Sequence, residues 1–145
     1  KDIKADYCYV DAMALNLIRN PWEYDVMVME NMFGDILSDL GGGLIGGMGM
    51  ASCAEIGDNH GLFQPAHGSA PDIAGKGLAN PLATILSVGM MFKYSFGREE
   101  VNAKIESAVE SVLDQGIRTR DIMSNKMTEV STHEMGDKIV MELEK

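Results

Sequence analysis

One stretch indicates the class of this protein most clearly: His67-Gly-Ser-Ala-Pro-Asp-Ile-Ala-Gly-Lys-Gly-Leu-Ala-Asn-Pro81. Its glycines, prolines and small side chains cannot build a hydrophobic core. They suit a loop whose backbone amides are open to a ligand, because glycine allows close approach to the main chain. Asp72 could accept hydrogen bonds from ribose hydroxyls. Asn80 and Pro81 predict a helix start, in which a capping side chain precedes the residue best suited to the first helical position.

Glycine content alone favours a plain structured turn over a binding loop, and two familiar nucleotide-binding motifs do not match. A P-loop needs four residues between its first glycine and the Gly-Lys pair, followed by Ser or Thr. Here six residues separate Gly68 from Gly75, and Gly77 follows Lys76. The Gly-x-Gly-x-x-Gly fingerprint of the Rossmann fold is also absent from this loop.

The composition narrows the class of protein. The chain has 145 residues, 46% of them hydrophobic, which is enough for one sizeable core. A formal net charge of −10 argues against nucleic acid or an anionic membrane as a partner. Cys8 and Cys53 lie far apart, as is ordinary in a reducing cytosol, and no apolar run reaches the length of a membrane span. We therefore expect a cytoplasmic protein, and because the first residue is Lys1 rather than Met, we expect a piece of a longer one.

Strands alternating with helices predict an α/β fold. Short strands are expected at residues 7–10, 25–29 and 61–65, and the second is apolar enough to be buried on both faces. Helices are expected at residues 12–19, 33–45, 81–95, 98–115 and 132–143. Gly97 and Gly116 are placed to end two of these helices, and Ser131 with Glu134 forms a capping box at the start of the last one.

Two acids in the run Asn31-Met-Phe-Gly-Asp-Ile-Leu-Ser-Asp39 form a candidate metal site. Asp35 and Asp39 lie four residues apart, so a helix would place both carboxylates on one face, where they repel by about 0.2–0.5 kcal/mol. A bound divalent cation would make the close approach of the two carboxylates favourable, since Mg²⁺ or Mn²⁺ takes oxygen ligands from one or two carboxylates plus substrate and water. From spacing alone, a solvated acidic face is the more common explanation.

The loop at residues 67–81 and the run at residues 31–39 together resemble the β-decarboxylating dehydrogenases, the family of isopropylmalate, isocitrate, homoisocitrate and tartrate dehydrogenases. The resemblance extends from about Tyr9 to the C-terminus, and the loop is most similar to that of the isopropylmalate dehydrogenases. It implies an isocitrate/isopropylmalate dehydrogenase-like α/β fold, of which this chain is the C-terminal portion only. Residues 1–50 would end the dimer-forming, metal-binding domain, and residues 51–145 would form the C-terminal part of the cofactor-binding domain.

The resemblance also implies NAD as the cofactor. NADP-using relatives carry Lys-Tyr where this chain has Asp72-Ile73, and a carboxylate at this position would repel the 2′-phosphate of NADP. The residues that match the family's adenosine pocket are His67, Gly68, Ser69, Ala70, Asp72, Ile73 and Asn80.

Asp35 and Asp39 match the acids that bind Mg²⁺ or Mn²⁺ together with the substrate in this family. Asp11 matches a third acid that reaches the metal from the other subunit of a homodimer, although as a residue it could simply be a helix N-cap. The family's lysine and tyrosine, which act as general base and acid, and its substrate-binding arginines are expected upstream of Lys1. No catalytic residue is therefore assigned within this chain, and the chain alone is expected to be inactive.

The implied reaction is the NAD-dependent oxidative decarboxylation of a 2-hydroxy acid that bears a β-carboxylate, most like 3-isopropylmalate. Homoisocitrate, tartrate and isocitrate remain alternative substrates. An alternative of another class is a non-catalytic subunit or a nucleotide-binding, dimerising fragment. Gln64, where most members have a glutamate, and the missing N-terminal half of the family pattern both favour this alternative. The run Ser52-Cys-Ala-Glu55 also departs from the family pattern, which leaves the contacts to the nicotinamide open.

Other chemistries fit the sequence less well. A hydrolase triad of Ser69, His67 and Asp72 lacks a nucleophile elbow, and residues so close in one loop rarely reach triad geometry. His60 and His133 have no companions at metal-ligand spacing and are expected at the surface or near a helix cap.

Overall fold

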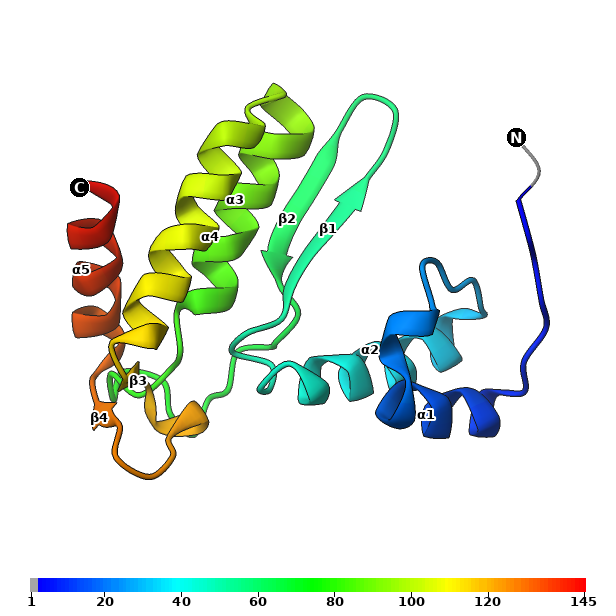
Figure 1. Cartoon of the computed structure of the whole chain (residues 1–145), viewed down its shortest axis with the longest axis horizontal. Coiled ribbons are helices and arrows are strands. Elements are labelled where there is room, and N and C mark those ends of the chain that lie inside the picture. The colour runs from blue at the N-terminus through cyan, green and yellow to red at the C-terminus, as the bar shows by residue number, and fades with distance from the viewer. Residues whose placement is uncertain (1–2) are drawn as a thin grey trace. The chain divides into compact units, whose positions relative to one another are not determined.

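The computed structural model describes residues 3–145. These form two compact units, the first ending at Ile45 and the second spanning Gly46–Lys145. Figure 1 shows the elements of both units in chain order. We call them unit 1 and unit 2. Whether they coincide with the two domains predicted at residues 1–50 and 51–145 stays a prediction.

Unit 1 consists of two α-helices and one short 3₁₀-helix. These are α1 (Val10–Arg19), η1 (Pro21–Glu23) and α2 (Asn31–Leu44). The helices expected at residues 12–19 and 33–45 are confirmed, each beginning two residues earlier than predicted. α1 and α2 contact each other, and between them they bury only Leu17, Leu37 and Gly42.

The two strands predicted in unit 1 are wrong. Val10 begins α1, and residues 7–9 form no strand. Residues 25–29 likewise form no strand, and Val26 and Val28 are 83% and 93% exposed instead of buried. Alternation and β-propensity describe a chain that fits a sheet, but a strand also needs a hydrogen-bonded neighbour. In the described chain neither segment pairs with one.

Unit 2 begins with an antiparallel hairpin, β1 (Ser52–Ile56) and β2 (Gly61–Pro65), in which Ser52 pairs with Pro65 and Ile56 with Gly61. The N–H of Gly57 donates to the carbonyl of His60 at 2.9 Å and closes the turn. The strand expected at residues 61–65 is confirmed. Its partner β1 was not predicted, because Ser, Cys, Ala and Glu give it little β-propensity.

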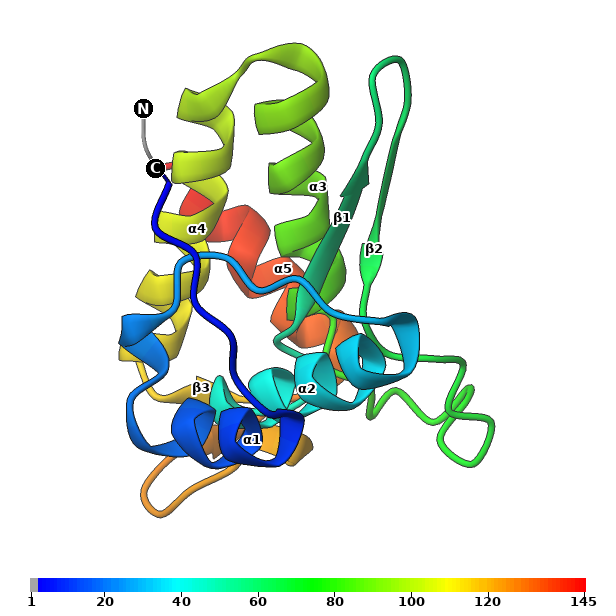
Figure 2. The same ribbon diagram turned by 90° about the vertical axis from the view of Figure 1, so that its right-hand side faces the viewer.

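Three helices complete unit 2: α3 (Leu82–Phe96), α4 (Glu99–Asp114) and α5 (Thr132–Leu143). α3 packs against both strands of the hairpin and against α4, and α4 also packs against α5 (Figures 1 and 2). β3 (Ile117–Arg118) and β4 (Thr128–Glu129) are strands of two residues each that pair in parallel. The 3₁₀-helix η2 (Arg120–Ile122) lies between them in the chain. The core cluster comprises Leu82, Ala108, Val109, Val112, Met135 and Ile139.

The helix ends of unit 2 follow the predicted signals. Gly97 adopts the left-handed conformation (φ 63°) after α3, and Gly116 does so (φ 77°) after α4. At α5 the Glu134 N–H donates to the Ser131 hydroxyl, and the Glu134 carboxylate accepts from the Ser131 N–H at 2.8 Å. Both halves of the capping box are therefore present, and α5 begins where the sequence predicts.

α3 and α4 approach each other closely at Gly89. A Cβ atom at this glycine would lie 2.7 Å from the Asn102 side-chain oxygen and 3.6 Å from the Ile105 Cγ2 atom. Only hydrogen fits there without movement of a neighbour. No helix in the described part of the chain is both long and apolar enough to cross a membrane.

Candidate cofactor loop and metal-binding acids

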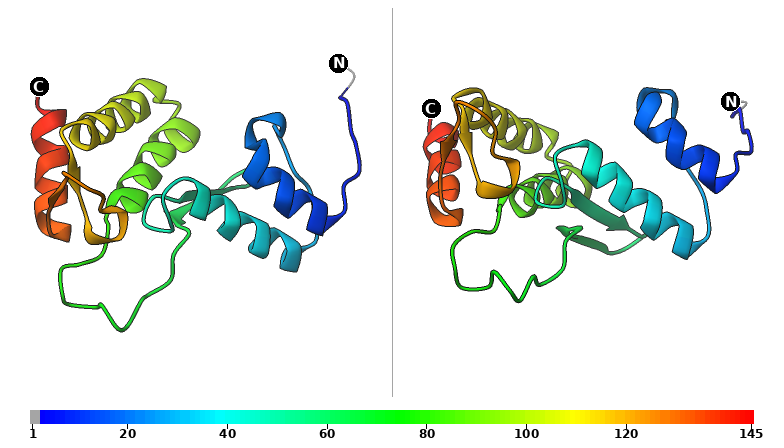
Figure 3. Two further views of the ribbon diagram at one scale, coloured as in Figure 1. Left: turned by 60° about the horizontal axis from the view of Figure 1, so that its bottom comes forward. Right: turned by 90° about the horizontal axis from the view of Figure 1, so that it is seen from below.

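The predicted cofactor loop connects the end of β2 to the start of α3 and extends away from both elements (Figure 3). It is fixed at its start, where the Ala66 N–H donates to the Ala51 carbonyl at 2.9 Å. Gly75 and Gly77 have positive φ angles of 75° and 67°, and Ala70 has φ 39°. A non-glycine residue with positive φ is strained, and such strain concentrates at ligand-binding sites.

The first half of the loop presents its polar side chains to solvent. His67, Ser69 and Asp72 are exposed, and only Ile73 is partly buried. The His67 Nδ1 atom lies 2.9 Å from the Gly68 carbonyl, which fits the tautomer with a proton on Nδ1. Gly68, Gly75 and Gly77 all have open space where a Cβ would stand. The loop therefore offers an exposed carboxylate and accessible backbone, which suits the ribose and adenine of a nucleotide.

Asn80 differs from these exposed loop residues because its side chain is buried. It is only 6% exposed, and its side-chain oxygen accepts the N–H of Leu82 at 3.0 Å, which caps α3. Its side-chain nitrogen donates to an Asp121 carboxylate oxygen at 3.1 Å. The predicted cap is confirmed, with Pro81 already in helical conformation before the assigned start of α3. Both the oxygen and the nitrogen of the Asn80 amide are therefore already hydrogen-bonded within the protein.

The predicted metal acids lie on the helices of unit 1. Asp35 and Asp39 are exposed and belong to α2, as the spacing required. Asp11 is the second residue of α1, and its carboxylate accepts the Ala12 N–H at 2.8 Å. Tyr9 occupies the N-cap position, so Asp11 is not the N-cap residue.

Within residues 3–145, no three His, Cys, Asp or Glu side chains are close enough together to hold a metal ion. Asp35 and Asp39 therefore lie on one helix, and Asp11 of the same chain does not join them in a group that could hold a metal ion. Two exposed carboxylates nevertheless suit Mg²⁺ or Mn²⁺, which commonly takes one or two protein carboxylates and completes its shell with substrate and water. A third acid from a second copy stays a prediction.

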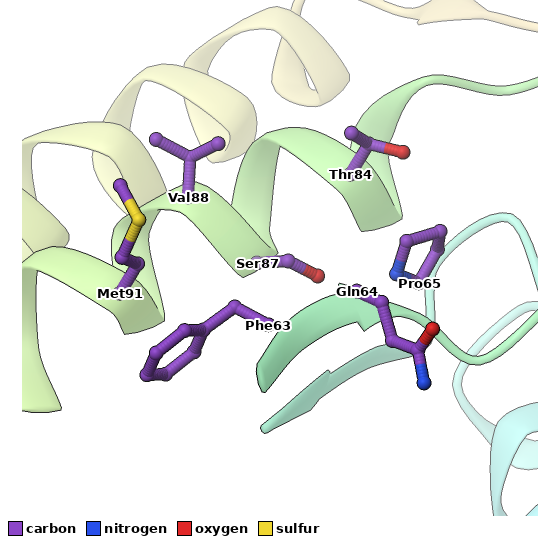
Figure 4. Close-up of a pocket in the computed structure, with 7 residues that line it drawn as sticks. All are labelled: Phe63, Gln64, Pro65, Thr84, Ser87, Val88 and Met91. Atoms are coloured by element: carbon purple, nitrogen blue, oxygen red, sulfur yellow. The ribbon is translucent and has the colours of Figure 1, made fainter. Parts of the chain in front are cut away.

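A shallow pocket lies between β2 and α3 (Figure 4). Phe63 and Met91 lie at one end of it, and Pro65 and Thr84 lie at the other. Its polar groups are mostly occupied: the Ser87 hydroxyl donates to the Ala83 carbonyl at 2.8 Å, and the Gln64 amide donates to Glu55 at 3.4 Å. The full lining consists of Phe63, Gln64, Pro65, Thr84, Ser87, Val88 and Met91.

A model of the isocitrate/isopropylmalate dehydrogenase family matches residues 1–139. Among curated proteins, the chain is 54% identical over 143 residues to a 3-isopropylmalate dehydrogenase of Hydrogenovibrio crunogenus and 51% identical over 144 residues to one of Aquifex aeolicus. These alignments cover 98% and 99% of this chain and 40% of each relative. The chain therefore belongs to the isocitrate/isopropylmalate dehydrogenase family, as the residues at 31–39 and 67–81 predicted, and it spans about two-fifths of these relatives.

Solved structures confirm the fold. An isocitrate dehydrogenase from Methylococcus capsulatus superimposes with a TM-score of 0.86 at 42% identity, over 94% of this chain and 40% of that one. A β-decarboxylating dehydrogenase from Thermococcus kodakarensis gives a TM-score of 0.80 at 41% identity, over 93% of this chain and 39% of that one. The predicted isocitrate/isopropylmalate dehydrogenase-like α/β fold is thus confirmed.

Proposed function

We propose that this chain is part of an NAD-dependent enzyme that oxidatively decarboxylates a 2-hydroxy acid bearing a β-carboxylate, most like 3-isopropylmalate. The observation that carries the proposal is identity above 50%, along nearly the whole chain, to proteins named 3-isopropylmalate dehydrogenase. The open loop with the exposed Asp72 carboxylate and the acid pair on α2 support it.

In this proposal the loop binds the adenosine half of NAD. The Asp72 carboxylate accepts hydrogen bonds from the ribose hydroxyls and disfavours NADP by repelling its 2′-phosphate. The open backbone at Gly68 and Gly75 allows the nucleotide to approach closely. The buried Asn80 fixes the end of the loop at the start of α3.

The acids of unit 1 would hold a divalent cation between two copies of the chain. Asp35 and Asp39 contribute from one copy, and Asp11 contributes from the other. When bound, Mg²⁺ or Mn²⁺ supplies a template and a Lewis acid for the substrate's hydroxyl and carboxylate oxygens. Asp35 and Asp39 would present their carboxylates to this cation from α2, and Asp11 would do so from α1 of the other copy. The overall reaction would transfer the C2 hydride to NAD, release the hydroxyl proton and release the β-carboxylate as CO₂.

The direct test is NADH formation by the protein as its own gene encodes it. We expect an increase in absorbance with NAD, Mn²⁺ and one of four acids, namely 3-isopropylmalate, isocitrate, homoisocitrate and tartrate. Asp35→Asn should abolish it, whereas Asp58→Asn, at an exposed acid in the β1–β2 turn, should not. NAD binding without turnover of any of the four would instead support a non-catalytic nucleotide-binding subunit. The 145-residue chain by itself is expected to form no NADH, because the general base alone contributes about 10²–10⁴-fold.

Cofactor choice gives a second test. Replacing Asp72 by Lys together with Ile73 by Tyr removes a repulsive carboxylate and adds a cation for the 2′-phosphate. We expect the ratio of NAD to NADP affinities, measured by titration, to fall or reverse in this double variant. A wild-type protein that prefers NADP would contradict the assignment of the loop.

A further inference from the structure

We infer that Thr132 and Asp121 are positioning residues that fix the second half of the cofactor loop, residues 77–81, for nucleotide binding. The inference rests on the proposed function, since it concerns how the NAD loop is held. Both residues lie far along the chain from the loop, and neither was assigned a role from the sequence.

Thr132 holds the loop from the start of α5. Its backbone N–H donates to the Gly77 carbonyl at 2.9 Å, and its hydroxyl donates to the Ala79 carbonyl. The first N–H groups of a helix have no partner within the helix, so the loop carbonyl satisfies one of them. α5 is itself anchored in the core by the fully buried Met135 and Ile139. Two loop carbonyls are thus attached to a rigid part of unit 2.

Asp121 holds the loop at its end. One carboxylate oxygen accepts from the Asn80 amide at 3.1 Å, and the other accepts from the Thr119 hydroxyl at 2.6 Å. Thr119 is fully buried, which fixes the direction of the carboxylate. The backbone also passes very close here, since a Cβ atom on Gly49 would lie 2.7 Å from both Asn80 and Asp121. The contacts leave little freedom at Asn80.

The first half of the loop has no comparable attachment. In the described chain, the hydrogen bonds of residues 67–76 join members of that stretch to one another: His67 to Gly68, Ile73 to Ala70, and Lys76 to Ile73. A ligand that contacts Asp72 therefore meets a segment bonded only within itself, whereas residues 77–81 are held by Thr132 and Asp121. Groups fixed before binding lose less entropy when the ligand arrives, so the attachments raise affinity for the nucleotide.

The experiment compares four variants of the protein as its own gene encodes it, three at threonines and Asp121→Ala. Thr132→Val removes the hydroxyl but keeps the shape and the backbone N–H. Thr132→Ser restores the hydroxyl, and Thr128→Val makes the same change at an exposed threonine in β4. NAD affinity is measured by titration. The KM values for NAD and for the hydroxy acid, kcat and Tm are measured in parallel.

We expect Thr132→Val to bind NAD about 3–10-fold more weakly, the effect of one lost hydrogen bond. kcat, the KM for the hydroxy acid and Tm should be unchanged, and Thr132→Ser should bind as wild type does. Amide exchange at position 132, whose N–H donates to the Gly77 carbonyl, should be faster in the Thr132→Val variant. Asp121→Ala should weaken NAD binding in the same way. A general loss of stability would instead change kcat and Tm in Thr132→Val.

The outcomes separate this inference from the proposed function. If wild type binds NAD and Thr132→Val binds it equally well, the positioning role is wrong while the proposed function stands. An equal loss in Thr128→Val, or no recovery in Thr132→Ser, also overturns the role. If wild type binds no NAD, the proposed function fails, and the inference fails with it.

Discussion

Units 1 and 2 differ most in how much of their apolar surface each buries by itself. Unit 2 closes a core around residues from α3, α4 and α5. Unit 1 also forms regular helices but buries only three residues within them. Its exposed large apolar side chains include Tyr7, Tyr9, Leu15, Ile18, Trp22, Val26, Val28, Met32, Ile36, Leu44 and Ile45.

The difference shows that local sequence can specify a helix without specifying the surface that packs against its apolar face. Apolar residues at helical spacing form α1 and α2, but a large exposed apolar surface is typical of a protein–protein interface. We predict that a second copy of the chain covers the surface of unit 1, with α1 and α2 at the centre of a homodimer. Unit 2 needs no such cover to bury its core.

The largest expected effect comes from a charge placed on unit 1. Ile18→Asp, at a residue of α1 that is 57% exposed, would bury an unpaired carboxylate in the predicted dimer. A buried unpaired charge costs about 3–5 kcal/mol, so the dimerisation constant should fall by at least about 10²-fold. Sedimentation equilibrium measures it. Ile56→Asp, at an equally exposed isoleucine of unit 2, is the control and should leave the dimer intact. A wild-type monomer at micromolar concentration would contradict the prediction.

A deletion in the core of unit 2 should have the next largest effect. Leu82 is 0% exposed, so Leu82→Ala should lower the free energy of unfolding by about 2–5 kcal/mol through lost burial and a cavity. Leu62→Ala, at a half-exposed position of β2, should change it by less than about 1 kcal/mol. Urea denaturation of both variants gives the comparison. Similar losses would mean that the core is not where the structure places it.

Two glycines of unit 2 should respond to the same change with opposite signs. Gly89→Ala would force a methyl group against Asn102 where α3 meets α4, which costs about 1–3 kcal/mol. Gly136→Ala lies inside α5 with open space at its Cβ position, so it should stabilise the protein by about 0.4–1 kcal/mol. Thermal melts would show both shifts. Destabilisation at Gly136 would contradict the open space found there.

The smallest expected effect concerns pH and the contact between α4 and α5. The Lys145 ammonium, then the Gln115 amide and the Ser111 hydroxyl, hold the pKa of Glu142 at about 2, below its ordinary 4.5. A lowered folded-state pKa adds stability above pH 4.5, and this stability is lost as the pH falls from 4.5 through 2. Glu142→Gln should therefore be less stable than wild type at pH 7, with the difference shrinking below pH 4.5 in urea melts. Glu144→Gln, at a neighbouring exposed acid, is the matched control.

Much of the fold of unit 2 could be predicted because its signals are local. Gly97, Gly116 and the Ser131 capping box mark helix ends within a few residues of their effects. The strands predicted at residues 7–10 and 25–29 failed because pairing depends on another segment. β3 and β4 were missed for the same reason, since each consists of two residues defined only by the other.

The candidate site divides in the same way. The composition of the loop identified residues 67–81, and the spacing of Asp35 and Asp39 placed both on one helix. Thr132 and Asp121 could not be linked to the loop, because they lie 53 and 41 residues from the groups they contact. The sequence marks a capping box near Thr132, but it does not say which carbonyl the first N–H of the helix will meet.

The uneven attachment of the predicted cofactor loop also determines where a protease would cut. Cleavage needs an exposed segment that can adapt to the protease, and residues 67–76 are mostly exposed and bonded only among themselves. Trypsin would cleave after Lys76, between residues 67–76, which bond only among themselves, and residues 77–81, which Thr132 and Asp121 hold. The hairpin before the cut still packs against α3 after it, so a nicked chain keeps unit 2 together. Such a cut would detach Asp72 from the fixed residues 77–81 without unfolding the core.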